Sequence, residues 1–187
     1  MDDDGKWETR TADGLRLRVR RMSRQDGKAL QAFNETLSGE TRRKFLPHRY
    51  DDATVERVLQ RSESGEDLTF GAFDGKRLVG YFFLWRVRER VPLLGIGMLD
   101  AFQRQGLGRQ MMTILIAEAR ARGKDGIELT TTMENHAAFA LYQKMGFRYY
   151  RDVENVDGDG RVVVERAMFY EIAPGAKPME GKHAPPV

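Results

Sequence analysis

The sequence has no cysteine, which excludes disulfide bonds, thiolate metal ligands and a cysteine nucleophile. Its three histidines, His48, His136 and His183, have no ligand-like spacing, so we expect no metal site. The longest uncharged apolar runs, residues 78–85 and 91–99, are far shorter than the roughly 20 residues that a membrane-spanning helix needs. The acidic start predicts neither a signal nor a transit peptide. Together these absences predict a cytoplasmic protein without a membrane partner.

The composition is that of a folded domain. Of the 187 residues, 41% are hydrophobic and 10% aromatic, which is enough for a core and excludes full-length disorder. Charged residues make up 32% of the chain, yet the net charge is only +3. Arginines in the segment 15–20 alternate with apolar residues, which is typical of a half-buried strand. Without a continuous basic patch interleaved with aromatics, a nucleic-acid partner is not favoured.

The hydrophobic pattern predicts a chain of short strands and amphipathic helices. Strands are expected at 14–20, 68–73, 77–87, 91–99, 126–132, 147–154 and 161–171. Helices are expected at 24–37, once or twice within 40–64, at 107–122 and at 135–145. The pairs Asp74-Gly75 and Asp157-Gly158 predict hairpin turns before 77–87 and 161–171.

This order, β-α-α-β-β-β-α-β-α-β-β, predicts a mixed α/β sheet. The strands 91–99 and 126–132 are joined through a helix, so they should be parallel neighbours with a right-handed crossover. The strand 91–99 is apolar on both faces and is expected in the centre of the sheet. We expect a flexible extension over 1–12, a single domain over 13–172 and a disordered tail over 173–187.

The segment between the strand 91–99 and the next helix has the features of an anion site. Gly106 and Gly108 allow close approach to the backbone, and Arg104 and Arg109 supply positive charge. The first amides of a helix lack intrahelical partners, and its dipole favours an anion there. A pyrophosphate group fits this arrangement. Neither the dinucleotide fingerprint nor the Walker pattern is present, since Gly95 and Gly97 lack a third glycine and no Gly-Lys-Ser/Thr follows.

A second segment adds specificity to the first. Asn135 begins a helix that contains Leu141, Tyr142 and Lys144 and ends at Gly146-Phe147. Together with the spacing Gln103-x-x-Gly106-x-Gly108, this segment resembles the GNAT superfamily of acetyl-coenzyme A-dependent N-acetyltransferases. The resemblance covers about residues 70–150, and its segment 94–109 is particularly similar to bacterial enzymes that acetylate the N-terminal alanine of ribosomal proteins.

The resemblance implies a set of cofactor and catalytic roles, together with a GNAT-like sheet whose central parallel strands splay apart. Tyr142 would protonate the leaving sulfur, and Asn135 would hydrogen-bond the pantetheine arm near the thioester. Backbone groups of the strand would pair with that arm, namely those of Ile96, Gly97 and Met98. Backbone amides of the loop would hold the pyrophosphate, namely those of Arg104, Gln105, Gly106, Leu107, Gly108 and Arg109.

Elementary chemistry is consistent with these roles. A tyrosine is neutral at pH 7 and can give a proton to a transient thiolate, because the reference pKa of tyrosine is about 10 and that of a thiol about 8.5. Glycines 95 and 97 indicate a bulge or a close approach to the strand. Taken without their flanking motifs, Tyr142 reads as an ordinary helix tyrosine and Asn135 as an N-cap.

The sequence does not identify the general base. Members of the family often use a carboxylate on one of the splayed strands, but Thr130 stands where the alanine-acetylating relatives carry glutamate. The remaining candidates are Glu128, Glu89 and Glu134, each of which also reads as a surface charge, and a water chain is an equal alternative. The acidic turn at 152–159 either attracts a cationic amine or is simply hydrophilic.

The sequence therefore predicts an N-acetyltransferase that passes the acetyl group of acetyl-coenzyme A directly to a primary amine of a small molecule, peptide or protein. The alternative is a non-catalytic coenzyme A-binding module of the same fold, which the missing carboxylate favours and Tyr142 opposes. The sheet edges would also allow a homodimer.

Overall fold

The computed structural model describes residues 7–179, 183 and 185–187. Over these residues the chain forms an eight-stranded mixed sheet in the order β1-β2-β3-β4-β5-β6-β8-β7. The strands are β1 (Trp7–Arg10), β2 (Arg16–Arg21), β3 (Leu68–Asp74), β4 (Arg77–Trp85), β5 (Leu93–Met98), β6 (Gly126–Thr132), β7 (Arg148–Val156) and β8 (Val162–Glu171). The helices are α1 (Gly27–Thr36), α2 (Gly39–Lys44), α3 (Asp52–Glu63), α4 (Leu107–Ala121) and α5 (His136–Lys144), with 3-10 turns η1 (Arg24–Asp26) and η2 (Asp100–Phe102).

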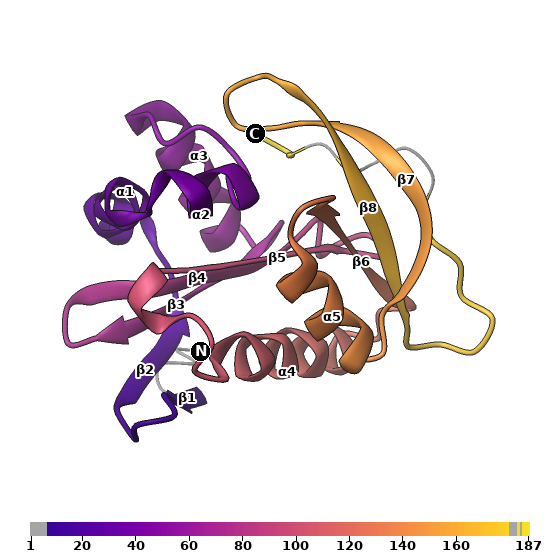
Figure 1. The fold of residues 1–187 in the computed structure, drawn as a ribbon, viewed down its shortest axis with the longest axis horizontal. Coiled ribbons are helices and arrows are strands. Elements are labelled where there is room, and N and C mark those ends of the chain that lie inside the picture. Colours follow the sequence, from indigo (N-terminus) through magenta and orange to yellow (C-terminus); the bar gives the residue numbers. More distant parts are fainter. Residues whose placement is uncertain (1–6, 180–182, 184) are drawn as a thin grey trace.

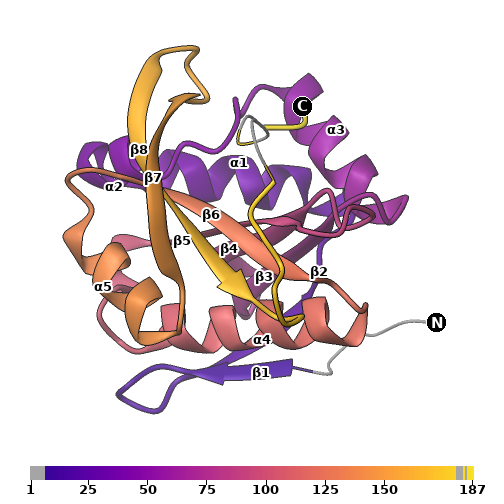
Figure 2. The same ribbon diagram turned by 90° about the vertical axis from the view of Figure 1, so that its right-hand side faces the viewer.

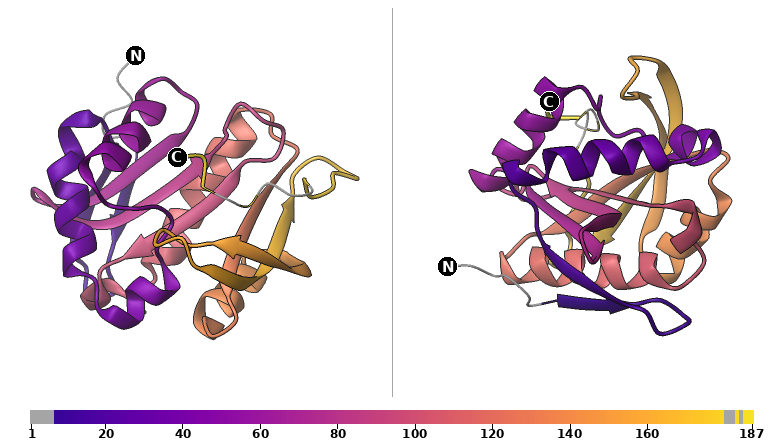
Figure 3. Two further views of the ribbon diagram at one scale, coloured as in Figure 1. Left: turned by 90° about the horizontal axis from the view of Figure 1, so that it is seen from above. Right: turned by 90° about the vertical axis from the view of Figure 1, so that its left-hand side faces the viewer.

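The helices form two layers, one on each side of the sheet. Helices α1 to α3 lie on one side of the sheet, whereas α4 and α5 lie on the other (Figure 1). The β7–β8 hairpin curves away at the far end and rises toward the side of α1 to α3 (Figure 2). Seen from above, it faces α2 across the middle of the molecule (Figure 3). This arrangement places the central strands β5 and β6 between the two layers.

Each layer is held by apolar side chains at the spacing of its element. Leu30 and Phe33 of α1 are buried against the sheet, as are Met111 and Leu115 of α4 on the opposite face. Such buried apolar stripes supply most of the free energy that keeps amphipathic helices on a sheet. None of the helices in the described part of the chain is long and apolar enough to span a membrane.

The predicted mixed α/β sheet is confirmed, including its parallel pair. β5 lies in the interior of the sheet between β4 and β6, and it runs parallel to β6. The predicted hairpin turns at 74–75 and 157–160 join β3 to β4 and β7 to β8. Most element bounds differ from the prediction by one to three residues, as expected where helix and strand ends fray.

The described residues of both terminal segments, which exclude 1–6, 180–182 and 184, are more ordered than the composition predicts. Residues 7–10, expected to be loose, form β1 beside β2, and Trp7 packs against the core. The polar residues around Trp7 give no strand pattern, so this short strand was not predicted. Residues 1–6 lie outside the described part. In the tail, the Ala173 amide bonds to the Asp125 carbonyl, and His183 is buried beside Tyr150, at 3.1 Å between Nε2 and the hydroxyl. Specific partners, rather than an apolar period, place these residues.

Candidate active site

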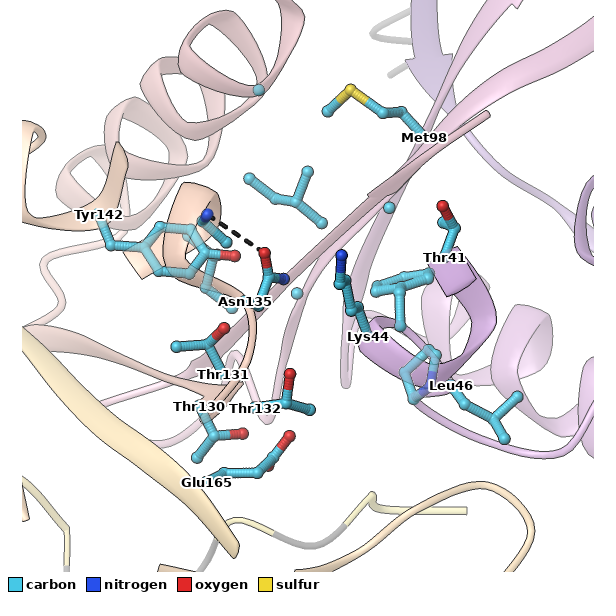
Figure 4. A pocket seen from close by; sticks show the side chains of 18 of the residues that line it. Thr41, Lys44, Leu46, Met98, Thr130, Thr131, Thr132, Asn135, Tyr142 and Glu165 are labelled. Carbon is cyan, nitrogen blue, oxygen red and sulfur yellow. Dashed lines mark hydrogen bonds between the residues drawn. The ribbon is translucent and has the colours of Figure 1, made fainter. Parts of the chain in front are cut away.

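A cavity of about 500 Å³ opens where β5 and β6 diverge. Figure 4 shows part of its lining, with α2 on one side and β6 and α5 on the other. The described lining comes from α2 and the loop after it, β4, β5, the loop before α4, β6, α5, the β7–β8 hairpin, and His183 and Pro185. Elements far apart in the sequence therefore share one site.

The divergence of the two parallel strands creates an unpaired backbone edge. Leu93 of β5 pairs with Glu128 of β6, and the register continues no further. On its other edge β5 stays paired with β4 as far as Met98. Backbone groups of residues 96–98 thus line the cavity without a strand partner on that side. A buried unpaired strand edge favours an extended ligand with amide groups of its own.

The glycines of β5 are explained by aromatic rings rather than by a bulge, since the β4–β5 register is continuous. A Cβ on Gly95 would lie 2.1 Å from the Phe83 ring, and one on Gly97 would lie 2.3 Å from the Phe45 ring. These two rings and Trp85 form an aromatic wall, with Phe83 and Trp85 stacked 4.1 Å apart. The structure therefore shows neither a bulge nor an approaching backbone at these glycines, but side-chain rings packed against them.

The loop before α4 and the first turn of that helix contribute Gln103, Arg104, Gly106, Gly108 and Arg109 to the cavity lining. Arg104 and Gly106 both have positive φ, 59° and 80°, so the chain turns sharply into the helix. Within the described residues, no carbonyl accepts from the amides of 104–109, whereas Gln110 already bonds to the Gly106 carbonyl. The side chains of Arg104 and Arg109 also line the cavity. Unpaired amides at a helix start beside two arginine side chains are the features of an anion site.

The carboxylate of Asp100 fixes helix α2 beside this loop. Its two oxygens accept from the Ser38 amide and hydroxyl, at 3.0 and 2.6 Å, and from the Thr41 hydroxyl, at 2.7 Å. These hydrogen bonds, led by the Ser38 hydroxyl, lower the pKa of Asp100 to about 2. Gln103 adds a further bond to Thr41 at 3.0 Å. These hydrogen bonds join α2 to the segment that leads into the loop before α4.

Asn135 and Tyr142 project from α5 toward the cavity (Figure 4). The Asn135 side-chain oxygen accepts from the Ala138 amide at 3.3 Å, so the side chain caps the helix and its NH₂ group remains for a ligand. Burial raises the pKa of Tyr142 to about 12, with a smaller contribution from the negative charge of Glu165. Tyr142 is therefore protonated at neutral pH.

The carboxylates that the sequence singles out lie away from the cavity lining. Glu128 is buried, accepts a hydrogen bond from the Tyr150 hydroxyl at 2.9 Å, and lies 3.9 Å from His183. Burial raises the pKa of Glu128. Glu89 lies in the turn before β5, at the end opposite to the divergence. Neither side chain is part of the described lining, so their assignment as a base stays a prediction.

Sequence reasoning indicated the acidic turn of the β7–β8 hairpin, whose Asp157 lines the cavity, but missed Asn155 and Glu165. Glu165 and Asn155 line the cavity, and the Asn155 NH₂ group donates to a Glu165 oxygen at 2.9 Å. At the hairpin tip, the Gly158 amide donates to the Leu46 carbonyl at 2.9 Å and bridges to the loop after α2. Glu165 could have been indicated only by knowing which side chains of β8 face the cavity and how β8 pairs with β6.

His48 has a structural role. It is buried, its Nδ1 donates to the Arg49 carbonyl at 2.6 Å, and its Nε2 accepts from the Tyr81 hydroxyl at 3.0 Å. These contacts hold the loop that carries Leu46 and Pro47 into the cavity wall. In the described part of the chain, no cluster of three histidine, aspartate or glutamate side chains is arranged to hold a metal ion.

A comparison with protein-family models places residues 30–147 in a known family. They match the acetyltransferase (GNAT) family, and this range is more than half of the chain. Among curated proteins, the chain is 30% identical over 106 residues to the uncharacterized N-acetyltransferase YvbK of Bacillus subtilis, covering 56% of this chain and 63% of that protein. It is 29% identical over 92 residues to the [ribosomal protein bS18]-alanine N-acetyltransferase of Escherichia coli K12, covering 49% and 62%. The chain thus spans less than two thirds of these relatives.

Solved structures share the fold over most of the chain. The GNAT domain of S. lividans PAT superposes with a TM-score of 0.75 at 18% identity, covering 89% of this chain and 96% of that one. The acetyltransferase yncA from Salmonella typhimurium, solved with acetyl-CoA, gives 0.69 at 19% identity, covering 88% and 99%. At these identities the similarity establishes the fold.

Proposed function

This chain belongs to the acetyltransferase (GNAT) family, and on that basis we propose that it transfers an acetyl group from acetyl-coenzyme A directly to a primary amine. The observation that carries the proposal is the convergence of three features in one cavity: the amides of 104–109, the unpaired edge of β5 and the protonated Tyr142. A non-catalytic binding module would need the first two but not the third.

The cavity fits acetyl-coenzyme A in the chemistry of its parts. Amides of Arg104 to Arg109 would bind the diphosphate, and the two arginine side chains would add charge. Backbone groups of Ile96, Gly97 and Met98 would pair with the amide-containing arm, with the Asn135 NH₂ group beside it. Bound there, acetyl-coenzyme A would supply a thioester whose acyl carbon an amine can attack.

The chain's own groups would then promote transfer by position and by proton donation. The β5 edge orients the acyl group, and an amide at Met98 polarises its carbonyl. Tyr142 donates its proton to the departing sulfur. Because the described chain has no cysteine and no adjacent serine–histidine pair is among the lining residues, direct attack by the amine is simpler than a covalent acyl-enzyme.

The test measures binding and turnover separately. Isothermal titration calorimetry with coenzyme A should detect binding, and Leu107→Pro or Gly106→Val should weaken it at least tenfold by disturbing the loop. Release of free thiol from acetyl-coenzyme A should then depend on added amine. Binding without amine-dependent thiol release would identify a coenzyme A-binding module, whereas absence of binding would overturn the proposal altogether.

Two further predictions from the sequence stay open. A homodimer is compatible with β7 as an edge strand and with the exposed side chains of Val156, Val162 and Val164 on the same hairpin. Sedimentation velocity at two protein concentrations would detect it. A cytoplasmic location also stays a prediction.

A further inference from the structure

Charge is distributed unevenly around the cavity. The basic side chains come from α2, the loop before α4 and the first turn of α4, namely Arg43, Lys44, Arg104 and Arg109. The acidic side chains among the described lining residues are Asp157 and Glu165, both from the β7–β8 hairpin. The basic part suits a diphosphate, so the acidic part is the place for the second substrate.

Of the two carboxylates, Glu165 lies on a strand of the sheet, whereas Asp157 lies in the hairpin turn. One Asp157 oxygen accepts from the amides of Asp159 and Arg161, each at 2.9 Å, and so holds the turn together. One Glu165 oxygen accepts from the Asn155 NH₂ group at 2.9 Å, and within the described part of the chain no donor contacts its other oxygen. Asn155 itself is held, because its carbonyl oxygen accepts from the Val156 amide. Glu165 is thus oriented and still has an acceptor oxygen.

Glu165 also lies near the reacting end of the cavity. In the β6–β8 ladder it stands directly opposite Thr132, so the two side chains share a face of the sheet and both line the cavity. Figure 4 shows Glu165 beside Thr130 and Thr132, on the side of the cavity that also holds Tyr142. The charge of Glu165 contributes to the raised pKa of Tyr142, which places the carboxylate within electrostatic range of the phenol.

Two buried polar atoms in the lining indicate a polar ligand group in the same region. Thr132 Oγ1 and Trp85 Nε1 are both buried and have no hydrogen-bond partner among the described residues. Leaving such a group unpaired costs roughly 1–3 kcal/mol, so a bound partner for either atom would be favoured. The surrounding wall is apolar and includes Leu46, Pro47, Phe83, Val156 and Val163.

We propose that Glu165 is the acceptor-binding carboxylate and general base of this site, held by Asn155, and that the acceptor is a primary ammonium on an apolar stem. This inference rests on the proposed function and deepens it. The ammonium would lie against the free Glu165 oxygen, and its stem would lie along the apolar wall.

The proton and electron balance of the step is complete. Glu165 takes one proton from the ammonium, and the amine nitrogen uses the freed electron pair to form a bond to the acetyl carbon. As the carbon–sulfur bond breaks, its electron pair leaves with the sulfur, which receives the Tyr142 proton. The second nitrogen proton restores Tyr142, and Glu165 releases its proton to solvent. The products are an acetamide, coenzyme A and one proton.

The experiment compares two amines of similar size and different charge. Benzylamine is an ammonium at neutral pH, whereas aniline is uncharged and requires no base before attack. Glu165→Gln should lower kcat/KM for benzylamine about 100-fold and for aniline less than about threefold, because only the first needs proton removal. Asn155→Ala should lower the benzylamine value about fivefold, which is the loss expected for one hydrogen bond.

Controls separate this role from a structural one. Glu154→Gln removes an exposed carboxylate from the same hairpin, outside the cavity, and should leave both amines unaffected. Circular dichroism and the Kd for coenzyme A should be unchanged in Glu165→Gln, since the diphosphate loop lies on other elements. Glu165→Asp, with a shorter side chain, should recover part of the benzylamine activity.

Each outcome decides between named hypotheses. If wild-type protein releases thiol with benzylamine and Glu165→Gln does so equally well, the inference is wrong while the proposed function stands. If Glu128→Gln or Glu89→Gln is the variant that loses the charged amine, the base is the carboxylate indicated by the sequence. If wild-type protein binds coenzyme A and acetylates no amine, both proposals fail.

A primary ammonium on an apolar stem occurs both in lysine side chains and in small-molecule amines, and two further substrates distinguish these sources. Nα-acetyl-lysine amide carries it as a lysine side chain, and phenethylamine carries it as a free small molecule. A tripeptide that begins with alanine, whose amine is flanked by a peptide carbonyl, should react at least tenfold less well than the better of these two. Preference for the tripeptide would overturn the assigned acceptor class.

Discussion

At the scale of single residues, Tyr142 is the side chain whose chemistry is most directly tested. Burial raises its pKa to about 12, so the phenol keeps its proton throughout the neutral range and is available to the leaving sulfur. Tyr142→Phe should lower kcat about 10- to 100-fold while the Kd for coenzyme A stays within about twofold. Thiol release at saturating substrates and calorimetry measure the two quantities.

A matched tyrosine serves as the control for this variant. Tyr149 is exposed on β7 and donates to Asp152 at 3.2 Å, away from the cavity. Tyr149→Phe should change neither quantity. A Tyr142→Phe enzyme with wild-type kcat would mean that the sulfur leaves as a thiolate or takes its proton from water.

His48 makes a residue-level prediction about stability. Burial lowers its pKa from 6.5 to about 4, because the charged ring would lose its water. As pH falls, the unfolded chain takes up this proton first. The stabilisation is therefore complete above pH 6.5 and is lost as pH falls toward 4, by about 2 kcal/mol between pH 7 and pH 5.

The measurement is the unfolding free energy of wild type and His48→Gln by urea denaturation at both pH values. Other titrating groups, such as Glu128, whose pKa is raised, are common to the two proteins and cancel in the difference. The wild type should lose more stability than the variant on acidification. Equal losses would show that His48 is protonated as easily in the fold as outside it.

The residues that the sequence indicated and that the structure brings to the cavity are those that lie close together along the chain. The unpaired amides of 104–109 could be predicted because the loop leads into a helix. The capping bond of Asn135 could be predicted because this residue stands at a helix start. Glu165 carried no such signal. Its position depends on which residue of β6 it faces, and strand register is set by packing far from either strand's own sequence.

At the scale of elements, the contact between the β7–β8 hairpin and the loop after α2 determines how the cavity is enclosed. A Cβ on Gly158 would lie 2.4 Å from the His48 carbonyl oxygen, so Gly158→Ala must separate the two elements. We expect a loss of about 1–2 kcal/mol in unfolding free energy and a KM for amine raised several-fold, with KM for acetyl-coenzyme A little changed.

Asp159→Ala at the same tip is the control, since Asp159 is exposed and makes no bond to the loop after α2 among the described residues. Denaturation and steady-state kinetics report the two effects. If Gly158→Ala instead raised both KM values equally, the bridge would be supporting the whole cavity rather than its acceptor part.

Element positions were largely predictable because each has its own period. Strands β3 to β6 follow from apolar runs between clear turns, and α4 follows from its helical stripe. β1 was not predictable, because its four residues include Thr9 buried between exposed neighbours and carry almost no hydrophobic pattern. The described tail residues likewise depend on partners such as Asp125 and Tyr150, which no local pattern reveals.

At the scale of the whole molecule, the sheet consists of two parts joined at one place. β1 to β5 form one continuous ladder and β6 to β8 another, and Leu93 and Glu128 are the residues paired between them. The α4 connection and the hairpin bridge to Leu46 also hold these parts together, as do the bonds from the Asp125 and Glu128 amides to the Arg90 and Pro92 carbonyls. A ligand that lies between β5 and β6 would therefore contact both parts at once.

Coenzyme A should accordingly stabilise the molecule as a whole. At 100 times its Kd, mass action adds about 2.7 kcal/mol to the unfolding free energy, which for a chain of this size raises Tm by about 5–10 °C. Hydrogen exchange should slow not only in the loop 104–109, which holds the diphosphate, but also along residues 95–98 and 130–132 on both sides of the divergence. Coenzyme A shortened to its nucleotide diphosphate should reproduce the first effect without the second. Protection confined to the loop with the intact ligand would show that the arm does not lie between the strands, and that the two parts of the sheet are held together by the protein alone.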